Sequence, residues 1–109
     1  MNKKKQIRID VSLDENHLPE KLEWEADDGV GKKTAGAALI SFWDKDEQQA
    51  LRVDLWDKDF TTDEMKTFFV QTLLTMNDTL ERATGDTETC AGIREFGLDL
   101  GKHLGVITE

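Results

Sequence analysis

The stretch of sequence most suggestive of chemistry runs from Gly29 to Thr34 (GVGKKT), because glycines beside lysines are typical of phosphate-binding loops. Such a loop needs a glycine five residues before its Gly-Lys pair and a serine or threonine directly after it. Those positions hold Ala26 and Lys33. The residues that follow also predict a strand, whereas bound phosphates need the N-terminus of a helix. The stretch therefore does not predict a nucleotide-binding site.

Carboxylates gather around Asp44 and Asp57, and clustered carboxylates can bind calcium. An EF-hand loop that started at Asp57 would need a glycine where Thr62 stands and a glutamate where Phe68 stands. Neither requirement is met. We interpret these residues as solvated turn carboxylates and expect no metal site.

The remaining candidates for catalysis are His17, His103 and Cys90. The histidines are far apart in the sequence and belong to no HExxH or paired-cysteine pattern. No serine or cysteine occupies an elbow-type nucleophile motif. Cys90 is near the start of an expected helix, where a thiol pKa can fall, but the favoured interpretation is a small packing residue. We therefore expect no catalytic residue and no cofactor, and hence no enzyme.

The charge of the chain narrows the class of partner. The formal net charge is −9 over 109 residues, and this field repels the phosphate backbone of nucleic acids. The one basic cluster, Lys3 to Lys5, is expected to belong to a frayed N-terminus over residues 1–5. No signal peptide follows it, and no stretch has the length of a membrane span. We expect a cytoplasmic protein that binds no nucleic acid and does not insert into membranes.

The first sixty residues carry the period of strands. Apolar and polar residues alternate from Ile7 to Leu13, from Leu22 to Ala26 and from Leu51 to Trp56, which predicts three half-buried strands. The stretch from Ala35 to Trp43 is apolar on both parities, which predicts a strand covered on both faces. Polar turns and a flexible connection over residues 28–33 separate them, so a four-stranded antiparallel meander is expected.

The period changes at Thr61, where a helix is predicted to begin. Thr61 and Glu64 form a capping box, and apolar residues then recur at helical spacing until Gly85. Asp86 or Thr87 can cap a second helix that stops at Gly105. Three glycines recur every fourth residue in it, and since each interior glycine costs about 1 kcal/mol relative to alanine, a close approach to a neighbouring element is expected.

These elements together predict an α+β fold. We expect one domain over residues 1–109, in which a four-stranded antiparallel sheet is followed by two helices packed on one face. The outward face of the sheet then carries the candidate protein interface, which consists of Leu39, Trp43, Arg52, Asp54 and Trp56, unless the parity is reversed or a loop folds over this face. Tryptophan and arginine concentrate in interface cores, and such a face can also pair with its own copy, so a homo-oligomer through it stays open.

Several segments together resemble the gliding motility GldC family of Bacteroidetes, over about residues 7–107. The segments that carry the resemblance are LDENHLP from Leu13, WEADD from Trp24, SFWD from Ser41, LRVDLWDKD from Leu51, DEMKTFF from Asp63 and DTLERATGD from Asp78. The resemblance implies a cytoplasmic accessory protein of gliding motility, with no assigned reaction, cofactor or catalytic residue.

The leading hypothesis is a non-enzymatic adaptor that binds an unidentified protein partner in gliding motility or its linked secretion machinery. An acidic export chaperone similar in outline to SecB is the alternative, since it would bind unfolded clients on an apolar sheet face. A third hypothesis, an enzyme or a small-ligand carrier, requires a closed polar pocket that holds His17 or His103 with carboxylates.

Overall fold

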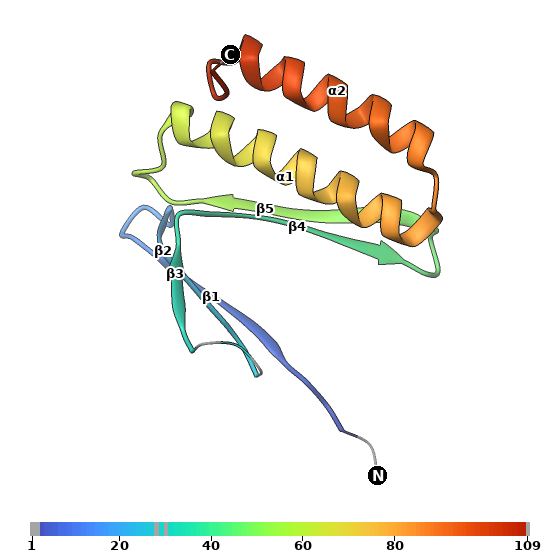
Figure 1. Cartoon of the computed structure of the whole chain (residues 1–109). Coiled ribbons are helices and arrows are strands. Elements are labelled where there is room, and N and C mark those ends of the chain that lie inside the picture. Colours follow the sequence, from blue (N-terminus) through green and yellow to red (C-terminus); the bar gives the residue numbers. More distant parts are fainter. Residues whose placement is uncertain (1–2, 28, 30, 109) are drawn as a thin grey trace. The chain divides into compact units, whose positions relative to one another are not determined.

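The computed structural model describes residues 3–27, 29 and 31–108 (Figure 1). The predictions for residues 1–2 and for Asp28 and Val30 lie outside this range. The chain divides into two compact units, residues 1–60 and 61–109, and each is described by itself. Five strands occupy the first unit and two helices the second, within the described residues. The single-domain assignment stays a prediction.

The first sheet of the N-terminal unit has the order β1-β2-β3, with both pairs antiparallel. It consists of β1 (Ile7–Leu13), β2 (Pro19–Ala26) and β3 (Lys33–Ala35). The register places Val11 opposite Leu22 and Leu22 opposite Ala35, so these three share one face of the sheet. Leu22 is almost fully buried, which makes this row the centre of the sheet's apolar packing.

The second sheet is the hairpin of β4 (Ala37–Asp44) and β5 (Gln49–Trp56), which pair antiparallel along their whole length. The turn between them contains Gln48 in the left-handed region at a φ of 52°. Asp44 accepts hydrogen bonds there from the N–H groups of Asp46 and Glu47, at 3.0 and 3.4 Å. The carboxylate of Asp44 therefore closes this turn.

The predicted single four-stranded sheet is wrong, because the structure contains one three-stranded and one two-stranded sheet. The stretch from Ala35 to Trp43, expected as one strand, bends at Gly36: β3 before the bend pairs with β2, and β4 after it pairs with β5. A Cβ atom at position 36 would lie 3.0 Å from the Phe60 ring, so glycine is what leaves room for that ring. Coverage on both faces is also wrong at the far end of β4, where Phe42 and Trp43 are exposed.

Asp14 organises the turn between β1 and β2. Asp14 accepts hydrogen bonds from the N–H groups of Leu18 and Asn16, at 3.0 and 2.8 Å. The Leu18 bond is the largest cause of a lowered pKa of the Asp14 carboxyl, and the Asn16 bond and the nearby Lys58 ammonium lower it further. Lys58 lies 3.5 Å from Asp14, which joins this turn to the segment after β5.

The first helix begins and ends where the sequence predicts, whereas the second begins as predicted but ends at His103, before the expected Gly105. Thr61 and Glu64 form the expected capping box of α1 (Thr62–Thr84), and Gly85 terminates it in the left-handed conformation. Asp86 is the N-cap of α2 (Thr87–His103). Hydrogen bonds from the Thr89 side chain and N–H lower the pKa of the Asp86 carboxyl, the side-chain bond contributing most.

Glycines in α2 allow close contact with α1, which runs alongside it (Figure 1). A Cβ atom at Gly97 would lie 2.7 Å from Leu74, and one at Gly101 would lie 3.3 Å from the buried Val70 and 2.5 Å from Ile107. The expected compensation for two of the three spaced glycines is thus contact with the first helix. The third, Gly105, has a φ of 76° just after α2.

Polar contacts fix the same helix pair in register. Asn77 of α1 is buried, and its Nδ2 donates a 2.8 Å hydrogen bond to the backbone carbonyl of Cys90 in α2. Nearer the surface, the guanidinium of Arg94 donates to Asp78 at 2.9 Å. Because one bond is buried and directional, a shift of α2 along α1 would leave the Asn77 amide without its partner.

We predict opposite stability effects for two alanine substitutions in α2. Gly92→Ala meets nothing within 4 Å and should stabilise the fold by up to about 1 kcal/mol through helix propensity. Gly101→Ala places a methyl against Val70 and Ile107 and should cost about 1–3 kcal/mol through overpacking. Urea unfolding followed by circular dichroism measures both, and equal stability of the two variants would contradict the close contact.

The Asp86 cap predicts an acid-sensitive helix. Because folding lowers this pKa below its ordinary value of 3.8, the cap stabilises the folded state above that pH, and this stabilisation is lost as the pH falls through the folded-state pKa. Asp86→Asn keeps a capping oxygen that does not titrate. The difference in unfolding free energy between wild type and variant should therefore change below about pH 4. A difference independent of pH would exclude this role for Asp86.

Candidate functional site

The five predicted interface residues lie on one face of the β4–β5 hairpin. Side chains of directly opposed residues in an antiparallel pair point to the same side. The register opposes Leu39 to Asp54, and it places Trp43, Arg52 and Trp56 on that side as well. We call this surface, made of Leu39, Trp43, Arg52, Asp54 and Trp56, the tryptophan face.

Two large aromatic side chains dominate the tryptophan face. Trp43 is 66% exposed and Trp56 52% exposed, while Leu39 is half-buried. A tryptophan is among the largest apolar side chains, so its exposure leaves much apolar area in water. Both tryptophans are exposed, and the binding of a partner to them stays a prediction.

An ion pair lies between the tryptophans in the sequence. The Arg52 guanidinium donates to Asp54, with 2.9 Å between Nη2 and Oδ1, and both side chains are partly exposed. An exposed pair of this kind contributes little to stability. Its consequence is geometric, because it holds a planar cation in a defined direction on the apolar surface.

The opposite face of the hairpin, expected to be the covered one, also exposes apolar side chains. Phe42 is 63% exposed, and Leu51 and Val53 are each 47% exposed. The register opposes Phe42 to Leu51, so these residues adjoin on that face. Strand periodicity indicated two faces correctly but did not reveal that both carry exposed apolar groups.

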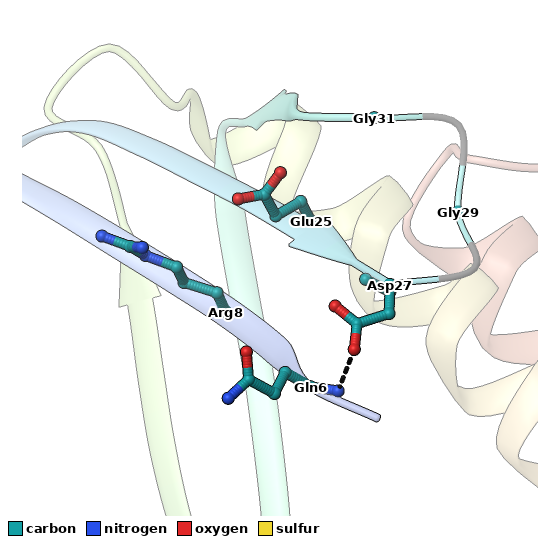
Figure 2. A pocket seen from close by; sticks show the side chains of 7 residues that line it. Gln6, Arg8, Glu25, Asp27, Gly29 and Gly31 are labelled. Atoms are coloured by element: carbon teal, nitrogen blue, oxygen red, sulfur yellow. Dashed lines mark hydrogen bonds between the residues drawn. The ribbon is translucent and has the colours of Figure 1, made fainter. Parts of the chain in front are cut away.

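A polar hollow of about 340 Å³ is found in the first sheet, at the end of the β1–β2 pair (Figure 2). Asp27 accepts a 2.8 Å hydrogen bond there from the Gln6 N–H, drawn as a dashed line. Arg8 lines the hollow, but its Nε is paired with Asp10 at 3.1 Å. Neither histidine lines it, so it is not the pocket that the ligand-carrier hypothesis requires.

The other residues considered for catalysis, His17, His103 and Cys90, occupy a turn, a helix end and a buried position. His17 occupies a turn at a φ of 64°, and His103 is the last residue of α2. Cys90 is fully buried, and burial raises the pKa of its thiol, which opposes a reactive thiolate. Within the described residues, no three His, Cys, Asp or Glu side chains are grouped as metal ligands.

A protein-family model described as "Gliding motility-associated protein GldC-like" matches residues 19–106. The chain belongs to the GldC-like family. This confirms the resemblance noted in the sequence and makes the GldC-like chain a gliding motility-associated protein. The match begins at the first residue of β2, so the tryptophan face and both helices lie within it.

Searches of the curated proteins and of the solved structures found no match to the GldC-like chain.

A membrane-crossing helix is not found in the described part of the chain, because neither α1 nor α2 is sufficiently long and apolar. Family membership therefore identifies the process, gliding motility. What the chain does in that process has to be inferred from the surface of the molecule.

Proposed function

We propose that this GldC-like chain is a non-enzymatic, cytoplasmic accessory protein of gliding motility that binds another protein through the tryptophan face. The exposure of Trp43 and Trp56 on one face, with the Arg52 guanidinium between them, carries the proposal. Tryptophan and arginine dominate the binding energy of protein interfaces because they bury large, rigid surfaces and donate directional hydrogen bonds.

The charge of the chain supports a particular kind of partner. With a net charge of −9, the molecule attracts a surface with basic groups around an apolar centre and repels acidic ones. Asp54 and Arg52 add one charge of each sign within the tryptophan face. The proposed partner is therefore a protein whose apolar patch has a basic rim.

The tryptophan face is tested by substituting each face of the hairpin in turn. The double variant Trp43→Ser/Trp56→Ser changes the tryptophan face, and Phe42→Ser/Leu51→Ser is the matched control on the other face. All four side chains are exposed, so both variants are expected to fold. In gliding cells that carry each variant in place of the wild type, only the tryptophan variant should lose a co-purifying protein and reduce gliding speed.

Equal retention of that protein by both variants would argue against the tryptophan face as its binding site. Equal loss would instead mean that both faces take part, and this outcome favours a second candidate function. That candidate is an acidic export chaperone, and the observation that supports it is the exposure of Phe42 and Leu51 as well as of the two tryptophans. A chaperone for unfolded clients uses a broad apolar surface rather than one specific face.

Aggregation kinetics distinguish the chaperone from the adaptor. A chemically denatured enzyme is diluted into buffer with or without the GldC-like chain, and light scattering follows its aggregation. A chaperone should slow aggregation, and both double variants should weaken that effect because each removes exposed apolar area. An unchanged aggregation rate at excess GldC-like chain would remove the chaperone hypothesis and leave the adaptor proposal intact.

A further inference from the structure

We infer that β5 pairs antiparallel with the β5 strand of a second copy of this chain, about a two-fold axis at Val53. The pairing joins two β4–β5 hairpins edge to edge into one four-stranded sheet. The inference concerns the backbone edge of the hairpin, with its register set by the side chains of Arg52 and Asp54, and it does not depend on the proposed function.

The outer edge of β5 is open. The β4–β5 sheet has two strands, so within the described residues no strand pairs with β5 on the side away from β4. An unpaired edge presents a row of N–H and C=O groups that can pair with another chain. Two-stranded sheets are also marginally stable, and a third or fourth strand strengthens them.

The hydrogen-bonding parity of β5 identifies which residues present these groups. Hydrogen-bonded and non-hydrogen-bonded pairs alternate along an antiparallel ladder. Asp57 donates its N–H to the Gly36 carbonyl at 2.9 Å, just beyond the last pair of strand residues. Counting back by twos, Val53 is bonded to β4, whereas Arg52 and Asp54 direct their backbone groups to the open edge.

A two-fold axis at Val53 matches both the backbone groups and the charges of two copies. It opposes Arg52 of one copy to Asp54 of the other, in both directions, and these are the residues whose N–H and C=O groups face the edge. Opposite charges directly across two strands stabilise the pairing, and like charges oppose it. An axis shifted to Leu55 would instead oppose Arg52 to Lys58, which is repulsive.

The free part of the β5 edge is long enough for this pairing and ends before Lys58. Lys58 donates its N–H to the carbonyl of Pro19 at 3.2 Å, so the start of β2 occupies the edge just beyond β5. The axis at Val53 pairs Ala50 with Trp56 and therefore stops short of Lys58. The edge of β4 has no comparable charge pattern. It carries no charged residue from Ala37 to Trp43, so no ion pair would select a register there.

Charge reversal tests the pairing. Light scattering should show a wild-type dimer, while Arg52→Asp and Asp54→Arg should each be monomeric because each places like charges opposite each other twice. An equimolar mixture of the two variants should form a heterodimer, since every opposed pair is then of opposite charge. This rescue also shows that both variants are folded. A monomeric wild type, a dimer that survives either reversal, or a mixture that stays monomeric would overturn the inference.

Disulfide trapping tests the position of the axis. Val53 of each copy lies in a non-hydrogen-bonded pair, whose Cα atoms are about 4.5 Å apart, within the range that a disulfide spans. Oxidised Val53→Cys should therefore form a covalent dimer. In Leu51→Cys, the matched control, the two cysteines are displaced by four residues, or about 13 Å along the strand, and should not link. Wild type controls for the buried Cys90. Equal linking of both variants, or none of Val53→Cys, would exclude this register.

Discussion

The approach of the Phe60 ring to Gly36 governs the layout of the N-terminal unit. With a Cβ at this position only 3.0 Å from the ring, glycine is the residue that permits the contact, and the chain bends there between β3 and β4. The strand that would otherwise continue one sheet instead begins a second. The hairpin thereby acquires its own two edges and two faces.

The helical unit is subject to a related constraint, because glycines in α2 permit its close contact with α1. Gly97 and Gly101 bring α2 against Leu74 and Val70 of α1, and the buried hydrogen bond from Asn77 to the Cys90 carbonyl fixes the register. Apolar contact alone would tolerate sliding, whereas a buried amide that must keep its partner does not. Cys90 is buried in this unit, and burial together with the nearby carboxylates of Glu81 and Asp86 raises the pKa of its thiol.

The hairpin offers two kinds of surface that the same residues serve in different ways. The side chains of Trp43 and Trp56 present an apolar face, while the backbone of Arg52 and Asp54 presents an open edge. The two surfaces share the side chains of Arg52 and Asp54, which belong to the tryptophan face and also select the register of the edge pairing.

The sequence by itself determined the features that depend on neighbours along the chain. Local geometry determines the capping box at Thr61, the left-handed Gly85 and the alternation that places Trp43 and Trp56 on one face. The family follows from the order of the sequence segments that resemble it. Only the tertiary structure decided that Gly36 divides the strands between two sheets, because alternation reports which way a side chain points but not which strand lies beside it. The exposure of Phe42 on the face expected to be covered was decided there too, since the burial of an apolar residue depends on neighbours that are distant in the sequence.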